Sequence, residues 1–179
     1  ERKNLSYQHR LEYTIEQLRS PPKTENGDSP EIPEFETVLE AVDYALKMYP
    51  NYLTFTEKGY DGARSCRYGK PNQVFSALEW LATTYRAIRD GKLKDSFEQS
   101  SLTNTGMHYS PHQHKSTMRT YPDEYYTVWG GEKRVLREHL SKGISRSPIE
   151  TIRIGFFYDK PTTVVGIGYL GQHQRNRNT

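Results

Sequence analysis

Residues 150–173 read ETIRIGFFYDKPTTVVGIGYLGQH, and this stretch decides the fold. Two runs rich in β-branched and aromatic residues flank a turn over residues 159–162, which is the strongest hairpin pattern in the chain. Pairing Tyr158 with Thr163 gives the hairpin one apolar face that can pack on a core. On this register the aligned pairs are Phe156 with Val165, Ile154 with Ile167 and Ile152 with Tyr169.

The other face of the hairpin carries three glycines, Gly155, Gly166 and Gly168, which would leave a shallow, bare patch of backbone. Glycine inside a strand usually marks a bulge or the close approach of another group. The same register places Arg153 opposite Gly168, and basic residues follow the second strand. This face and its end are therefore the candidate site.

Two long helices are predicted before the hairpin. Residues 35–49 carry apolar side chains at i, i+3, i+4 and i+7, and residues 72–90 carry a second such stripe, with Asn72 as its N-cap. The segments between them predict two short elements, a strand over residues 52–56 and a helix over residues 57–66. These helices are expected to pack on the apolar face of the hairpin.

The segment between the second helix and the hairpin is harder to interpret. Residues 94–123 show no sustained period, which leaves either a functional loop or unrecognised strands. Residues 125–129 predict a strand, and residues 132–140 predict a short helix. The expected fold is α+β, with two long helices on a small antiparallel sheet that ends in the C-terminal hairpin.

The N-terminal part is expected to be an appendage. Residues 1–19 predict a helix, either the end of a coiled coil that could join chains into a homo-oligomer or a helix docked on the domain. Residues 20–34 are rich in proline and acidic residues and predict a linker. The single α+β domain then spans residues 35–179. Because the sequence begins without Met, we expect it to be part of a longer protein.

Composition narrows the environment and the partners. One cysteine, Cys66, allows no internal disulfide and favours a reducing cytoplasm. No apolar run has transmembrane length, so no membrane partner is expected. Residues 131–179 hold nine Lys and Arg against four Asp and Glu, whereas the first 130 hold sixteen against eighteen. This basic segment suits nucleic acid, although a solvated basic surface has the same composition.

Cations lie in the loop that enters the hairpin and in the segment that leaves it, and the predicted register brings both to the same end. Metal-independent cleavage of RNA needs cations beside the phosphate and groups that move protons, which Arg and His can supply. We therefore predict a catalytic role for Arg153, His173 and Tyr169. Strand surface residues and a solvated tail are the alternative interpretation. The predicted nucleic-acid contacts are Lys142, Arg146, Arg175, Arg177, Lys115 and Arg119.

The pattern of a helix, a loop with Lys and Arg, and two closing strands IRIGFFYD and VVGIGYLGQH resembles the C-terminal half of RelE/ParE-type bacterial toxins. The resemblance covers about forty residues of the 179 and rests on pattern. It implies a charged sheet face that acts on messenger RNA or gyrase. It matches Arg153 to the arginine that opens the first strand, and His173 to the basic residue that closes the last. The preceding helical region has no counterpart in the compact toxins.

Three histidines, His108, His112 and His114, have a spacing that could bind a transition metal, but no cysteine or nearby carboxylate completes the set. A solvent-exposed loop is the expected alternative, and we predict no cofactor. The leading hypothesis is an RNA-directed effector domain of a larger bacterial protein, a metal-independent endoribonuclease of toxin or phage-defence type. Two alternatives remain: a non-catalytic module that binds nucleic acid or nucleotide, and a protein-interaction domain.

Overall fold

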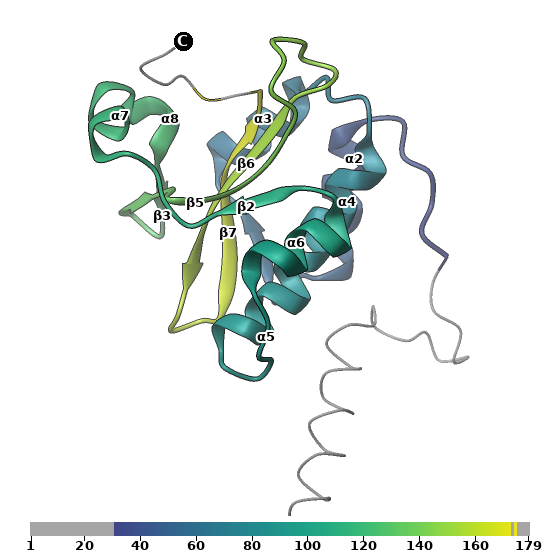
Figure 1. Cartoon of the computed structure of the whole chain (residues 1–179), viewed down its shortest axis with the longest axis horizontal. Coiled ribbons are helices and arrows are strands. Elements are labelled where there is room, and N and C mark those ends of the chain that lie inside the picture. The colour runs from purple at the N-terminus through teal and green to yellow at the C-terminus, as the bar shows by residue number, and fades with distance from the viewer. Residues whose placement is uncertain (1–30, 173, 175–179) are drawn as a thin grey trace, which may run out of the picture.

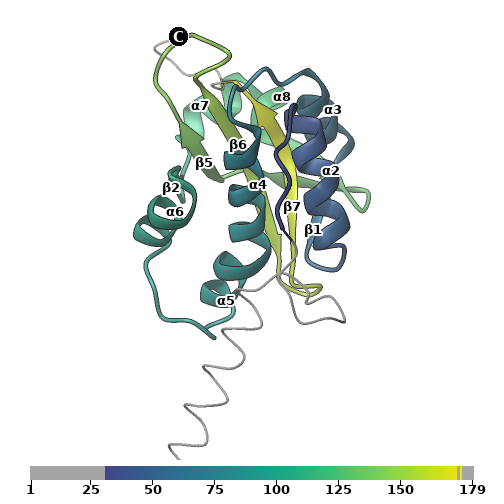
Figure 2. The same cartoon turned by 90° about the vertical axis from the view of Figure 1, so that its right-hand side faces the viewer.

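The computed structural model describes residues 31–172 and 174, which form an α+β domain built on a five-stranded sheet (Figures 1 and 2). The strand order is β1-β7-β6-β5-β2. All neighbouring pairs are antiparallel except β1 with β7, so the α+β class is confirmed and the expected antiparallel sheet has one parallel edge. The strands are β1 (Leu53–Phe55), β2 (His108–Ser110), β5 (Glu138–Lys142), β6 (Ile152–Asp159) and β7 (Val164–Gly171).

The first predicted long helix is α2 (Val38–Met48). It begins at Thr37, whose side chain accepts a hydrogen bond from the backbone N–H of Glu40 at 3.2 Å. Such a cap satisfies one of the N–H groups that a helix start leaves without a partner. The apolar stripe faces the core, and its buried residues are Val38, Ala41, Val42 and Ala45.

The second long helix is confirmed as three consecutive helical segments that contain a π-helical turn in the middle. They are α4 (Pro71–Trp80), η1 (Leu81–Tyr85) and α5 (Arg86–Arg89). The predicted cap was wrong. The helix begins at Pro71, whose fixed φ suits a first helical residue, and the Asn72 side chain instead accepts a hydrogen bond from Phe35 N at 3.0 Å. Asn72 therefore ties the entering chain to the helix.

The C-terminal hairpin is confirmed, but its predicted register was wrong. Tyr158 pairs with Val165 rather than with Thr163, and the pairing shifts again at a bulge beside Gly155. A bulge adds one residue to one strand and reverses the facing of the residues beyond it. Tyr169 therefore lies opposite Gly155 rather than Ile152, and Arg153 lies opposite Gly171 rather than Gly168.

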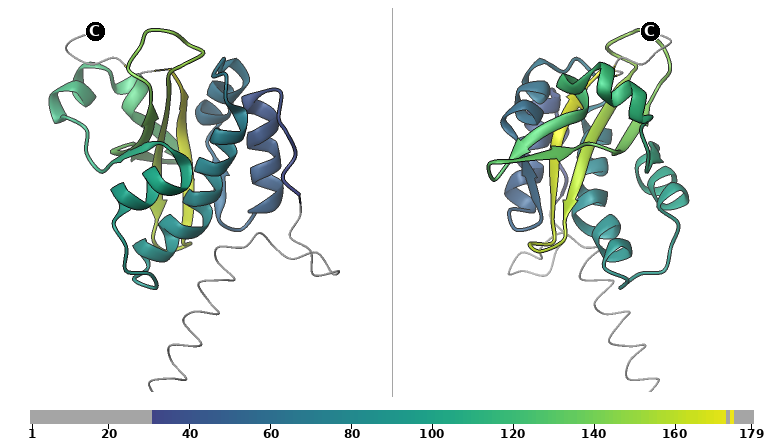
Figure 3. Two further views of the ribbon diagram at one scale, coloured as in Figure 1. Left: turned by 45° about the vertical axis from the view of Figure 1, so that its right-hand side comes forward. Right: turned by 90° about the vertical axis from the view of Figure 1, so that its left-hand side faces the viewer.

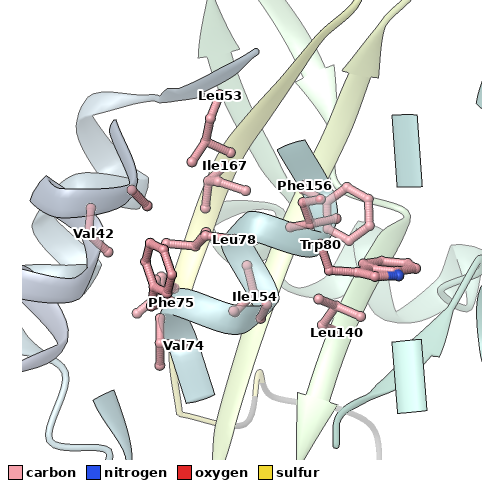
Figure 4. Close-up of a cluster of buried hydrophobic side chains, with 14 of the residues drawn as sticks. Val42, Leu53, Val74, Phe75, Leu78, Trp80, Leu140, Ile154, Phe156 and Ile167 are labelled. Atoms are coloured by element: carbon pink, nitrogen blue, oxygen red, sulfur yellow. The ribbon is translucent and has the colours of Figure 1, made fainter. Parts of the chain in front are cut away.

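The apolar face of the hairpin packs against the helices, as the sequence predicted. Figure 4 shows Ile154, Phe156 and Ile167 of the strands among Leu78 and Trp80 of α4. Each of the three strand residues is fully buried. Burying a side chain of this size contributes roughly 1.5–3 kcal/mol relative to leaving it in water. This layer therefore stabilises the packing of the helices on the sheet.

The opposite face is not the bare patch that its glycines suggested. The Phe157 ring covers Gly166, and a Cβ on Gly166 would lie 2.1 Å from the ring Cζ. Side chains of Leu136 and Thr127 cover Gly168 in the same way, at 2.6 and 2.8 Å. The local sequence indicated an open surface because the residues that cover these glycines are distant from them in the chain.

The covering residues come from a small second sheet and two short helices. The second sheet consists of β3 (Tyr126–Trp129) and β4 (Glu132–Val135), joined through Gly130 and Gly131. Both glycines have positive φ, 59° and 78°, as a two-residue type I′ turn requires. Figure 3 shows this hairpin and helix α8 across the sheet from α2 and α4. The short helices are α7 (Lys115–Thr120) and α8 (Pro122–Tyr125).

Two segments differ from their predictions. Residues 132–140 form strands β4 and the start of β5 rather than a helix, since the Gly130–Gly131 turn folds this chain back along β3. Residues 94–123 contain α6 (Phe97–Thr105), β2, α7 and the start of α8. Helix α6 lacks an apolar stripe because the residues that it buries are Ser100, Ser101 and Thr105.

Helix α3 (Glu57–Ser65) confirms the predicted short helix, and it packs closely on β7. A Cβ on Gly59 would lie 2.3 Å from the backbone oxygen of Ile167, and one on Gly62 would lie 2.2 Å from that of Leu170. Only glycine permits this approach.

Across residues 31–172 and 174, no helix combines the length and the apolar character needed to cross a bilayer. The predicted helix over residues 1–19 and most of the linker over residues 20–34 lie outside the described residues.

Candidate functional site

Arg153 and Tyr169, two of the three predicted catalytic residues, lie on the same face of neighbouring strands. Arg153 pairs with Gly171, and Tyr169 pairs with Gly155, which is two residues from Arg153 on β6. The bulge in β7 causes this arrangement, because it turns Tyr169 away from the helices. His173 lies outside the described residues.

Arg153 is buried within a polar cluster, with 9% of its surface exposed. Its guanidinium donates to the Gln174 side-chain oxygen at 3.5 Å and is hydrogen-bonded to the Tyr125 phenol. The Gln174 amide in turn donates to the backbone oxygen of Glu124. We call Arg153, Tyr169, Tyr125, Gln174 and Glu124 the Arg153 cluster.

Burial sets the proton affinities in the Arg153 cluster. It lowers the pKa of Arg153, and the neighbouring phenols of Tyr125 and Tyr169 oppose this shift. Burial also raises the pKa of Tyr169 to about 12, with a further contribution from the Glu124 carboxylate. The Tyr169 hydroxyl donates to the backbone oxygen of Gln172 at 3.0 Å. At neutral pH this phenol therefore keeps its proton and acts as a donor.

A hollow of about 330 Å³ opens beside Tyr169. The end of β7 forms one wall, and the C-terminal end of α3 forms the other, held there by the contact of Gly62 with the β7 backbone. Burial raises the pKa of the Cys66 thiol, so this half-buried cysteine stays protonated. We call this space the Tyr169 hollow; it is lined by Gly62, Ser65, Cys66, Arg67, Pro148, Tyr169, Leu170, Gly171 and Gln172.

The predicted nucleic-acid contacts that the structure describes lie near this end of the sheet. Arg146 is exposed in the loop between β5 and β6, and Lys115 and Arg119 are exposed on α7. Figure 1 and the left panel of Figure 3 show α7 and this loop at the same end of the molecule. Lys142 lines a separate hollow with Lys70. Arg175 and Arg177 lie outside the described residues.

The three histidines of the loop are exposed, and each occupies a different local setting. His108 is in β2, His112 follows it, and His114 immediately precedes α7. Within residues 31–172 and 174, no group of three or more His, Cys, Asp or Glu side chains is placed to hold a metal ion.

Sequence reasoning missed two polar groups, the buried imidazole of His139 and the half-buried carboxylate of Glu138. His139, on β5, has 6% of its surface exposed, and its Nδ1 lies 2.8 Å from the Gln113 amide nitrogen. It pairs with Gly155 and thus shares a sheet face with Arg153. Interpreting residues 132–140 as strands would have placed it there.

The second missed group is the Glu138 carboxylate, which accepts hydrogen bonds from the phenols of Tyr85 at 2.9 Å and Tyr109 at 2.6 Å. Arg89 lies 3.8 Å from its other oxygen. Burial is the largest cause of the raised pKa of both phenols. The Glu138 carboxylate raises the pKa of each further through its charge and its hydrogen bond. No local sequence pattern could reveal this cluster, because its members come from distant segments.

No protein-family model matches the chain, and the searches of curated proteins and of solved structures find no match either.

Proposed function

We propose that this domain binds single-stranded RNA at the end of the sheet where β7 ends, as the RNA-directed effector part of a bacterial cytoplasmic protein. The observation that carries the proposal is the Tyr169 hollow, which joins an aromatic wall, an exposed Arg67 and polar groups of Ser65 and Gln172. Proteins read single-stranded RNA by holding splayed bases against aromatic rings and by pairing cations with phosphates.

The surrounding charge supports the same proposal. Arg146, in the loop between β5 and β6, and Lys115 and Arg119, on α7, are exposed, and Figure 1 shows that loop and α7 at the same end of the molecule. These cations are the proposed phosphate contacts. RNA is favoured over duplex DNA because a hollow of about 330 Å³ accepts a base only after it leaves its stack. Exposed cations contribute to affinity mainly through released counterions, so binding should weaken steeply as salt rises.

Fluorescence anisotropy with a labelled single-stranded RNA, measured over a series of KCl concentrations, tests binding. Arg67→Ala should weaken binding and lower the slope of log K against log salt by roughly one. Arg137→Ala is the matched control, because Arg137 is exposed beside β4 and lines a different hollow. Binding that is absent at low salt, or an equal response to both substitutions, would refute the proposal.

A second candidate function, metal-independent cleavage of the bound RNA, is favoured by the proximity of Tyr169 to Arg153. In this reaction the RNA 2′-hydroxyl attacks the adjacent phosphorus and releases its proton to water, and the bond from phosphorus to the 5′-oxygen breaks. The Tyr169 phenol, protonated at neutral pH, can donate a proton to that leaving oxygen, and the neighbouring Arg153 guanidinium can stabilise the negative charge of the transition state. The toxin resemblance implies a role for Arg153 in the same reaction.

Cleavage of end-labelled RNA in the presence of EDTA tests the catalytic candidate. Tyr169→Phe keeps the ring and removes the hydroxyl, so the rate should fall by about 100-fold or more while RNA binding persists. Arg153→Ala is less informative because Arg153 is buried among polar partners, and its loss can unfold the domain. An unchanged cleavage rate in Tyr169→Phe would exclude the proposed proton donor.

A further inference from the structure

A second cleft, of about 430 Å³, lies between α6 and the helix formed by α4 and η1. It shares no residue with the Tyr169 hollow. Nine of its ten lining side chains are polar, two of these are carboxylates, and no Lys, Arg or His lines it. The lining residues are Ser76, Glu79, Trp80, Thr83, Thr84, Asp95, Gln99, Ser100, Thr103 and Asn104.

The π-helical turn places a threonine at this cleft. Thr84 belongs to η1 and has only 8% of its surface exposed. Within residues 31–172 and 174 its hydroxyl has no hydrogen-bond partner, whereas the neighbouring Thr83 donates to Glu79 O at 2.7 Å. The hydroxyl is not among the buried polar atoms that lack a partner, because Thr84 lines the open cleft. π-helical turns also occur often at functional sites. The Thr84 hydroxyl is therefore available to a ligand.

The wall opposite Thr84 is fixed by hydrogen bonds before any ligand arrives. The Trp80 indole N–H donates to the Ser100 hydroxyl at 3.0 Å, and the Asn104 amide donates to the Ser100 backbone oxygen at 2.7 Å. The first bond connects α4 with α6 across the cleft, and the second fixes the Asn104 side chain on α6. A cleft of this rigidity loses little entropy when it binds a small molecule.

The charge of the cleft selects a cation. Glu79 accepts a hydrogen bond from the Tyr49 phenol on its Oε1 at 2.7 Å, and no residue in the described part of the chain hydrogen-bonds its Oε2. Burial raises the pKa of Glu79, which a bound cation would counteract by favouring the charged form. Asp95 adds a second carboxylate from an exposed position. No metal-binding group of three or more His, Cys, Asp or Glu exists in the described part of the chain, so an organic cation fits better than a metal ion.

We propose that this cleft binds a small organic cation that carries hydroxyl groups, of the amino-sugar or amino-alcohol class. The ammonium group would lie between Glu79 and Asp95, and the hydroxyls would bond to Thr84 and to the amides of Gln99 and Asn104. A volume of about 430 Å³ lies within the range of small-molecule pockets. This binding is independent of the RNA site.

Calorimetric titration at pH 7 with D-glucosamine, and with N-acetyl-D-glucosamine as its neutral counterpart, tests the charge requirement. Glucosamine should bind at least about 10-fold more tightly than the neutral sugar, which corresponds to about 1.4 kcal/mol. Glu79→Gln on α4 should remove this preference, whereas Glu98→Gln, the same change on α6 at a residue that does not line the cleft, should preserve it. Equal binding of both sugars, or no binding of glucosamine at about 20 mM, would overturn the proposal.

A second variant separates binding from folding. Thr84→Val keeps the shape of the side chain and removes a hydroxyl that has no partner in the described chain, so thermal stability should stay equal or rise. Glucosamine binding should nevertheless weaken several-fold. Unchanged binding in a stably folded Thr84→Val protein would contradict the assigned role of this hydroxyl, and so would equal affinity for ethylammonium, which lacks hydroxyl groups.

Discussion

Replacing Gly59 with alanine should separate helix α3 from the sheet. Gly59 lies in the first turn of α3, and a Cβ there would lie 2.3 Å from the backbone oxygen of Ile167. An ordinary contact begins near 3.4 Å, so the two backbones must move apart by about 1 Å. Ile167 is fully buried in the middle of β7, where the ladder with β6 and β1 resists such a shift.

Two opposing free-energy terms set the size of the stability change in Gly59→Ala. Overpacking a rigid contact typically costs about 1–3 kcal/mol, and a backbone oxygen that cannot rotate away places this case near the upper value. Alanine has a higher helix propensity than glycine, and this stabilises α3 by up to about 1 kcal/mol. Gly59→Ala should therefore lower the free energy of unfolding by about 2 kcal/mol, which corresponds to a fall in Tm of roughly 4–8 °C for a domain of this size.

Urea unfolding followed by circular dichroism, together with a thermal scan, measures the effect. Ser65→Ala is the control on the same helix, because Ser65 is exposed and its hydroxyl bonds only within α3. Its stability should change by less than about 0.5 kcal/mol. If Gly59→Ala is as stable as the wild-type protein, the close packing of α3 on β7 is wrong, and so is the wall that α3 gives to the Tyr169 hollow.

Three further substitutions test other parts of the fold. Gly166→Ala should cost about 1–3 kcal/mol, and a double-mutant cycle with Phe157→Leu should recover about 1 kcal/mol, since the added Cβ meets the Phe157 ring. Arg86→Met should lower the urea midpoint by an amount equivalent to about 2–3 kcal/mol, because Arg86 donates at 2.6 Å to the backbone oxygen of Thr163, a turn residue with φ of 56°. Stability should fall between pH 10 and 12, because the folded state raises the pKa of Tyr169 to about 12 and so keeps a proton that the unfolded chain releases. Urea unfolding at several pH values measures this decrease in the free energy of unfolding, which should be shallower in Tyr169→Phe by up to about 1.4 kcal/mol per pH unit. An equal decrease in the wild-type protein and the variant would contradict the raised pKa of Tyr169.

The elements with local patterns were predictable from the sequence. Helix α2 has a cap and an apolar stripe within a dozen residues, and the strands of the C-terminal hairpin consist of β-branched and aromatic residues. Helix α6 was missed because it buries Ser100, Ser101 and Thr105, which carry no hydrophobic periodicity. Its polar buried face is the same property that makes the cleft beside it hydrophilic.

The hairpin register depended on contacts that no local pattern contains. The bulge in β7 falls where Leu136 and Thr127 cover Gly168, and both residues lie more than thirty positions earlier in the chain. Prediction of the candidate site was limited in the same way, by contacts between residues that are distant in the sequence. The sequence selected Arg153 and Tyr169, but the burial of Arg153 depends on Tyr125, and no local pattern brings that distant residue to β6.

The glycines and the arginine of this hairpin call for different explanations. The covered glycines are accounted for by packing alone, because each lies beneath a side chain that a Cβ would displace. Arg153 is not accounted for in this way. A buried cation costs several kcal/mol of desolvation, and an apolar residue of similar volume often gives equal or greater stability in such a position. The polar partners of Arg153 offset that cost, but they do not explain why a charge is present there.

The charge of Arg153 is explained if its field acts on an anion bound in the Tyr169 hollow. Arg153 lies on the strand next to that of the Tyr169 phenol, which lines the hollow. The prediction that follows is specific: a conservative Arg153→Lys variant that remains folded should bind RNA more weakly at low salt, although Arg153 itself is buried beneath the surface that the RNA contacts.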